Sequence, residues 1–332
     1  MSLFSPSGYC CPCIVHRHRA TCLGALLSAV IAILACGHYP AAAAKPEAKK
    51  YAVRVFRDIT YYKIPNDPDA ARHKLDVYRP APKGRYPLLL FLHGGAWVTG
   101  SKDDVFGWYG YGTIARCLAE RGLVVVLPNY RLSPGVRHPE HIKDVARAFA
   151  WAYQKGKEYG GDRDQFFVGG HSAGGHLAAL LATDETYLKA VGHRTKQIRG
   201  VIGVSGVYRL DGFDVKLLLA DRLGIFSGKV EVRPLAFIFS DKAVRQASPL
   251  HHVRRGLPPF LLLTGGWDYS PMRRMAKQFS AALKKYAVPV QVKEIPWRTH
   301  ETLLFDILHL SVDSASRDAI VHFIDRYKPK EK

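Results

Sequence analysis

The sequence predicts an α/β protein built on a mostly parallel sheet that is covered by helices on both faces. Short apolar runs bounded by turn residues alternate along the chain with longer amphipathic segments, a pattern typical of successive βαβ units. Most of the apolar runs lack polar alternation, which suits strands buried on both faces. A length of 332 residues with 48% hydrophobic and 23% charged residues argues against intrinsic disorder.

The individual elements follow from these runs in chain order. Strands are predicted at 87–92, 123–127, 166–168, 201–204, 260–263 and 290–295. Amphipathic patterns predict helices at 142–155, 174–183, 272–286 and about 314–327. Ligands of such sheets bind at the carboxyl ends of the strands, so the loops that follow the strands are where chemistry is expected.

The first 44 residues have the layout of an export signal or a membrane anchor. Residues 1–44 contain no Asp or Glu, and their only two charged side chains, both arginines, stand before an apolar run at 22–36. That run is 15 residues long, shorter than the about 20 that span a bilayer but typical of a signal peptide. Cleavage after Ala44, acylation of Cys36 as in a bacterial lipoprotein, and an uncleaved anchor all stay open. We expect an exported protein, periplasmic or secreted.

The remaining residues, 45–332, contain no repeat or low-complexity stretch and are predicted to form a single domain. The longest interval between predicted core strands leaves room for a small lid within 207–259. Five of the six cysteines belong to the first 44 residues, so Cys117 stands alone in the rest and no internal disulfide is expected. The sequence indicates neither a metal site nor a cofactor.

The chain is strongly basic, with a net charge of +20. Residues 1–44 contribute only two of these charges, so residues 45–332 keep +18. Such a charge attracts anionic partners, and association with a membrane or another anionic surface is one expectation. The basic residues are scattered along the chain rather than gathered in one segment, which argues against a nucleic-acid binder.

A serine at the end of a predicted strand is the candidate nucleophile. The strand at 166–168 runs into the sequence GGHSAGG at 169–175, which contains Ser172 and is followed by a helical pattern. This is G-x-S-x-G in a strand, turn and helix setting, where a sharp turn lifts the serine hydroxyl above the sheet. An ordinary glycine-rich turn is the alternative interpretation.

A serine hydroxyl needs a base, and the base needs a carboxylate to orient it. In this setting the chain order is serine, then Asp or Glu, then His. Asp268 lies in the loop after the strand at 260–263, and His300 lies in the loop after the strand at 290–295. Competing candidates further along fit the order or the placement less well: Glu301, Asp306, His309 and His322.

The loop after the strand at 87–92 is the candidate site for the negative charge of a tetrahedral intermediate. It contains the sequence HGGAW at 93–97, whose adjacent glycines let backbone N–H groups point inward. We assign the oxyanion hole to the N–H groups of Gly94, Gly95 and Ala173, since such donors stabilise the developing charge.

With these residues in view, the sequence resembles the α/β-hydrolase esterases, in particular the hormone-sensitive-lipase-like and BD-FAE-like carboxylesterases, which include kynurenine formamidases. Besides the loops of Asp268 and His300, the resemblance rests on HGGAW at 93–97, PNYRLSP at 128–134, GGHSAGGHLAALLATD at 169–184 and the Ser248-Pro249 turn. It implies the α/β-hydrolase fold, with a mostly parallel central sheet of about eight strands and helices on both faces. The departures are Ala96, in place of a third glycine, and an uncommon histidine loop, THETLLFD.

The resemblance also implies a serine hydrolase that cleaves carboxylic esters, usually with short acyl chains, through an acyl-enzyme and without a cofactor. Two alternatives stay open: an arylformamidase-type amide hydrolase, and a non-enzymatic envelope protein that binds anionic surfaces on a hydrolase scaffold. Trp97, Trp267 and Phe239 are candidates either for the wall of a substrate pocket or for the core. The acyl and alcohol parts of the substrate and the oligomeric state are not indicated by the sequence.

Overall fold

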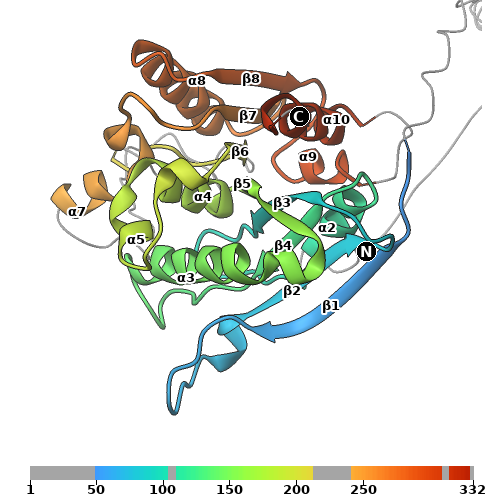
Figure 1. The fold of residues 1–332 in the computed structure, drawn as a ribbon. Coiled ribbons are helices and arrows are strands. Elements are labelled where there is room, and N and C mark those ends of the chain that lie inside the picture. The colour runs from blue at the N-terminus through green and yellow to red at the C-terminus, as the bar shows by residue number, and fades with distance from the viewer. Residues whose placement is uncertain (1–48, 104–109, 212–240, 309–313, 330–332) are drawn as a thin grey trace, which may run out of the picture. The chain divides into compact units, whose positions relative to one another are not determined.

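In the computed structural model, the described residues form a sheet of eight strands (Figure 1). The structure describes residues 49–103, 110–211, 241–308 and 314–329. The strand order is β1-β2-β4-β3-β5-β6-β7-β8. The strands β1 and β2 pair antiparallel, as do β2 and β4, and all later neighbours pair parallel. Their bounds are Val53–Thr60, Lys74–Pro80, Tyr86–Leu92, Val124–Pro128, Gly161–His171, Gly200–Val204, Phe260–Gly265 and Val290–Ile295 for β1 to β8.

Helices cover both faces of this sheet. One apolar cluster joins α3 (Glu140–Lys155), α4 (Ala173–Thr183) and α8 (Ser270–Lys285) to one face. A second cluster joins α2 (Tyr111–Ala119), α9 (Thr302–Phe305) and α10 (Ala315–Tyr327) to the other face. Shorter helices are α5 (Glu185–Lys189) and α7 (Asp241–Gln246). The predicted α/β-hydrolase fold, with its mostly parallel sheet of eight strands, is therefore confirmed.

The strand β3 explains why the sheet needs two apolar layers. Its Leu88, Leu90 and Leu92 lie in the first cluster, whereas Leu89 and Phe91 lie in the second, and all five are fully buried. Successive side chains of a strand point to opposite faces, so an unbroken apolar run is required where both faces are covered. Fully burying one such side chain stabilises the fold by about 1.5–3 kcal/mol.

The six predicted strands correspond to β3 to β8, whereas the sequence interpretation did not include β1 and β2. These two strands form the antiparallel edge and carry charged residues such as Arg57 and Asp76. Asp76 is nevertheless buried, because Lys102 places its ammonium group 3.0 Å from the carboxylate. The predicted segment 1–44 lies outside the described residues, as do residues 212–240 of the region assigned to a lid. Among the helices that the structure describes, none is both long enough and apolar enough to cross a membrane.

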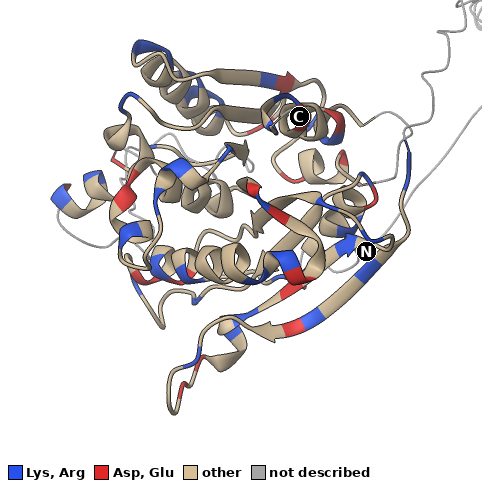
Figure 2. Cartoon of the chain, viewed as in Figure 1, with Lys and Arg blue, Asp and Glu red and all other residues tan. Residues whose placement is uncertain are grey.

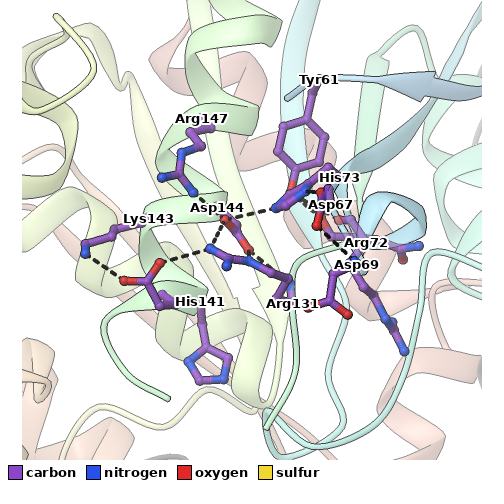
Figure 3. A network of polar contacts seen from close by, with 12 residues as sticks. Tyr61, Asp67, Asp69, Arg72, His73, Arg131, His141, Lys143, Asp144 and Arg147 are labelled. Carbon is purple, nitrogen blue, oxygen red and sulfur yellow. Dashed lines mark hydrogen bonds and ion pairs between the residues drawn. The ribbon is translucent and has the colours of Figure 1, made fainter. Parts of the chain in front are cut away.

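A buried polar network ties the segment before β2 and the loop after β4 to α3 (Figure 3). Asp144 of α3 accepts hydrogen bonds from Arg131, at 2.8 Å from Nε and 2.9 Å from a terminal nitrogen. The ring of His73 lies between two carboxylates, with Nδ1 2.5 Å from Asp67 and Nε2 3.4 Å from Asp144. Because a buried charge is tolerated only when it is paired, this network fixes the three segments relative to one another.

Candidate active site

The nucleophile candidate stands on a strained turn between β5 and α4. The strand ends at His171, the helix begins at Ala173, and Ser172 between them has φ 53° and ψ −117°. A positive φ is unfavourable for any residue other than glycine, and strained residues of this kind are held in place by their surroundings. A Cβ on Gly174 would lie 2.2 Å from the carbonyl oxygen of Leu92. The final glycine of G-x-S-x-G is therefore required by close backbone packing.

Asp268 and His300 form a buried hydrogen-bonded pair, with Oδ1 of the carboxylate 3.0 Å from Nδ1 of the ring. Ser205, at the end of β6, donates to the other carboxylate oxygen at 2.5 Å, and the N–H of Tyr269 donates to Oδ1 at 2.8 Å. Burial alone would raise the pKa of Asp268, but its contacts with His300, Ser205 and Tyr269 hold it below the ordinary value. The carboxylate is therefore charged and fixed in orientation.

The position of His300 suits a general base. Because its Nδ1 faces a charged carboxylate, that nitrogen carries the proton and Nε2 is left to accept one. Among the described residues, the structure records no hydrogen bond between Ser172 and His300. The two residues are nevertheless neighbours, because the ring of His171, which directly precedes Ser172, lies 4.6 Å from the ring of His300, centroid to centroid. Catalytic hydrogen bonds often close only when substrate binds.

The loop after β3 has an unusual backbone course. Gly95 has φ 113°, and Ala96 and Trp97 have φ 52° and 61°. The N–H of Gly94 donates to the hydroxyl of Tyr111 at 2.7 Å, so this predicted oxyanion donor is already engaged with a protein acceptor. Ala173 is the first residue of α4, and the N–H groups of a first helical turn have no acceptor within the helix. Of the three predicted donors, Gly95 and Ala173 therefore fit an oxyanion better than Gly94.

The loops described here match a known family. The BD-FAE family model covers residues 75–283, which is more than half of the chain and includes Ser172 and Asp268. The chain belongs to the BD-FAE family. The predicted resemblance is thereby confirmed.

Two relatives of this BD-FAE family member have esterase names. Esterase LipC of Mycobacterium tuberculosis is 34% identical over 259 residues, which are 76% of this chain and 62% of LipC. The probable isoprenylcysteine alpha-carbonyl methylesterase ICMEL1 of Arabidopsis thaliana is 30% identical over 265 residues, which are 76% of this chain and 53% of ICMEL1. The chain thus spans about half to three-fifths of the length of these relatives.

Solved structures share the fold of this BD-FAE family member. Esterase B from Lactobacillus Rhamnosis superimposes with a TM-score of 0.65 at 20% identity, covering 92% of this chain and 95% of that one. The esterase from the archaeon Pyrobaculum calidifontis gives a TM-score of 0.63 at 23% identity, covering 85% and 87%. These likenesses support the α/β-hydrolase architecture.

Three residues near the site were not assigned a role from sequence. Ser205 orients Asp268, and its place directly after the strand β6 is a signal from which it could have been predicted. Tyr111 and His171 hydrogen-bond to each other at 3.0 Å beside the site. His171 lies within the G-x-S-x-G motif itself, whereas nothing in the sequence around Tyr111 marks it.

The aromatic candidates for a pocket wall fall in different places. Trp97 is buried in the first apolar cluster, so the core interpretation holds for it. Trp267 is 62% exposed and packs edge to face on Trp297, which is 71% exposed, with ring centroids 5.2 Å apart. Phe239 lies outside the described residues. In the part of the chain that is described, no group of three or more His, Cys, Asp or Glu side chains is placed to hold a metal ion.

Proposed function

We propose that this chain is a serine hydrolase that cleaves carboxylic esters with short acyl groups. The observation that carries the proposal is the buried pair of Asp268 and His300, joined at 3.0 Å, in loops beside the strained turn of Ser172. The esterase names of relatives support the same reaction class.

The reaction proceeds in two halves. Oγ of Ser172 attacks the ester carbonyl while Nε2 of His300 takes the hydroxyl proton, and the N–H groups of Gly95 and Ala173 hold the resulting oxyanion. His300 then gives the proton to the departing alkoxide, which leaves an acyl-enzyme. Water then attacks the acyl carbonyl while His300 takes its proton, the bond between Oγ of Ser172 and the acyl carbon breaks, His300 returns the proton to Oγ, and the carboxylic acid is released. Asp268 keeps the ring in the required tautomer throughout.

An acyl-length panel of aryl esters, together with a fluorophosphonate probe, tests this function. We expect the shortest esters to be cleaved fastest, and Ser172→Ala to abolish labelling and lower kcat by on the order of 10⁴-fold or more. Ser101→Ala is the matched control, because Ser101 is a serine in the loop after β3 whose hydroxyl accepts the backbone N–H of Asp103 at 3.1 Å. Labelling that persists in Ser172→Ala would overturn the assignment. Faster turnover of N-formylkynurenine than of any ester would favour the formamidase alternative.

We further propose that the protein is exported, to the periplasm or beyond, and works at anionic surfaces. The support for export is the layout of residues 1–44, and the support for the surface is the net charge of +18 in residues 45–332. Figure 2 shows lysines and arginines spread over many elements rather than collected on one. Trp267 and Trp297 follow β7 and β8, whose carboxyl ends share an edge of the sheet, and exposed tryptophans favour the interface of a membrane.

Sedimentation with vesicles tests the surface proposal independently of activity. We expect binding to vesicles with anionic lipid, weaker binding at high salt, and reduced binding when both Trp267 and Trp297 are replaced by alanine. Tyr286→Ala removes an exposed aromatic residue beyond the end of α8 and serves as the control. Equal binding to neutral vesicles at all salt concentrations would contradict the proposal. The mass of the N-terminal peptide after expression in a bacterial host tests export, and an intact residue 1 in the cytoplasmic fraction would contradict it.

A further inference from the structure

Three loops of the candidate site are linked by one chain of buried hydrogen bonds. The N–H of Gly94 donates to the hydroxyl of Tyr111 at 2.7 Å, and that hydroxyl lies 3.0 Å from Nδ1 of His171. Nε2 of His171 lies 3.1 Å from the carbonyl oxygen of His300. The chain thus runs from the loop after β3, through α2, to the residue before Ser172 and on to the loop of the proposed base.

The carbonyl end of this chain fixes the tautomer of a neutral His171 ring. A carbonyl oxygen can only accept, so Nε2 of His171 carries a proton and donates to the carbonyl of His300. In a neutral ring Nδ1 then has no proton and accepts the hydroxyl proton of Tyr111. The hydroxyl oxygen keeps lone pairs that receive the N–H of Gly94. Of the two neutral tautomers, only the one with the proton on Nε2 satisfies both contacts of the ring.

The surroundings of His171 favour this neutral form. Both Tyr111 and His171 are 4% exposed, and the titratable groups that face the ring are Tyr111, His300 and Asp268. Burial, reinforced by the positive charge that His300 takes up, lowers the pKa of His171 to about 3. Burial also raises the pKa of the Tyr111 hydroxyl, which keeps its proton.

The packing at Gly94 shows how closely the chain is fitted to the loop. A Cβ at Gly94 would lie 2.8 Å from the hydroxyl of Tyr111 and 2.9 Å from Nδ1 of His171. The two side chains therefore occupy the space that a side chain at position 94 would need. A shift of either ring moves the backbone from which Gly95 would donate to an oxyanion.

We propose that Tyr111 and His171 are positioning residues, a neutral relay of fixed polarity that holds the Gly94–Gly95 backbone, the Ser172 turn and the His300 loop in register for catalysis. The proposal rests on the proposed ester hydrolysis for its kinetic consequences, but not for the polarity of the relay. Neither residue exchanges a proton with substrate. Their effect is on the geometry in which Ser172 and His300 react.

Selective ¹⁵N labelling of histidine tests the polarity without any substrate. We expect the His171 ring of the wild-type protein, assigned by its loss in His171→Gln, to show a protonated Nε2 and an unprotonated Nδ1 from about pH 5 to about pH 8. A ring protonated on Nδ1, or one that titrates within this range, would overturn the relay. Because this readout needs no turnover, it separates failure of the relay from failure of the proposed function.

Kinetics on an aryl ester test the positioning role. We expect Tyr111→Phe to lower kcat about ten- to a hundredfold with little change in KM, because it leaves the Gly94 N–H and Nδ1 of His171 without a partner. His171→Leu is expected to lose as much activity. His171→Gln should recover part of it, since its side chain can both accept and donate. Unchanged kcat in Tyr111→Phe, or no difference between the two His171 variants, would overturn the role.

Tyr61→Phe is the matched control for these variants. Tyr61 is also a buried tyrosine, and its hydroxyl donates to the carbonyl oxygens of Asn129 and Arg72 at 2.9 and 3.2 Å, away from the relay. We expect this variant to lose stability without losing kcat. If Tyr61→Phe and Tyr111→Phe reduced kcat equally, the effect of Tyr111 would be general destabilisation and the positioning role would be overturned.

Discussion

The carboxylate of Asp144 is predicted to be the side chain on which the network of Figure 3 depends most. It is fully buried and accepts hydrogen bonds from Arg131 at 2.8 and 2.9 Å and from Arg147 at 2.6 Å. Nε2 of His73 lies 3.4 Å away. Asp144→Asn keeps the size of the side chain but removes the charge that these cations face.

The structure sets the size of the effect. Burial alone would raise the pKa of Asp144, but the hydrogen bonds and charges of His73 and Arg131 lower it from the ordinary 3.8 to about 2. One pKa unit equals about 1.4 kcal/mol, so the charged form is favoured by roughly 2–3 kcal/mol. Removing one partner of a buried ion pair costs about 3–5 kcal/mol, because the remaining charge is left uncompensated. We expect Asp144→Asn to lower the free energy of unfolding by about 3–5 kcal/mol.

The sign of the pH dependence separates this network from a simple packing effect. Asp144 contributes its stabilisation above pH 3.8 and loses it as the pH falls through about 2. For His73, burial alone would lower the pKa, but Asp144 and Asp67 raise it above the ordinary 6.5. The contribution of His73 is therefore complete below pH 6.5 and is lost as the pH rises through the raised pKa. The loss caused by Asp144→Asn should be larger at about pH 5.5 than at about pH 9.

Urea unfolding followed by tryptophan fluorescence measures this loss at both pH values. Asp164→Asn is the matched control, because Asp164 is an exposed carboxylate 3.3 Å from Arg85 and such surface pairs contribute at most about 1 kcal/mol. A loss in Asp144→Asn no greater than in Asp164→Asn would refute the reasoning. A loss that does not change between the two pH values would refute the part assigned to His73.

Two further predictions concern the candidate site. Ser205→Ala removes the 2.5 Å hydrogen bond to Asp268 and should lower kcat/KM on an aryl ester about tenfold or more. An unchanged kcat/KM would count against an orienting role for Ser205. Gly174→Ala places a Cβ 2.2 Å from the carbonyl oxygen of Leu92 and should prevent a stable fold, as measured by thermal unfolding. Gly192→Ala is the control: its Cβ would meet no atom within 4 Å, and its only cost is the positive φ of +78°. We expect it to lower the free energy of unfolding by about 1–2 kcal/mol. A Gly174→Ala protein as stable as Gly192→Ala would contradict the packing at the turn.

The sequence predicted the central strands well and the antiparallel edge not at all, for one physical reason. Strands buried on both faces must be apolar throughout, and β4 and β7 show that pattern in any window. The strand β2 contains Asp76, which is buried only because Lys102, 26 positions further on, supplies a partner at 3.0 Å. A local pattern contains no information on such a distant pairing.

In the candidate site, too, the residues marked by a local pattern could be predicted, and those linked by distant contacts could not. Ser172, Asp268 and His300 could be predicted because each follows an apolar strand in a loop of the expected order. The relay could not, since Tyr111 and His171 are 60 positions apart and His171 and His300 are 129 apart. The hydrogen bond from the N–H of Gly94 to Tyr111 also joins two separate segments, so the sequence pattern does not reveal it. Gly94 was therefore predicted to be an oxyanion donor.

The loop after β4 connects the stability of the fold to the geometry of the site. Arg131 in this loop is held by Asp144 through its side chain and through its backbone N–H, at 3.1 Å. The preceding residue, Tyr130, stacks on His93 with ring centroids 4.2 Å apart and donates its hydroxyl to the carbonyl oxygen of His93 at 2.9 Å. His93 is directly followed by Gly94, whose backbone the relay fixes from the opposite side. The loop after β3 is thus held between two buried polar systems, so hydrogen bonds as well as apolar packing maintain its strained backbone.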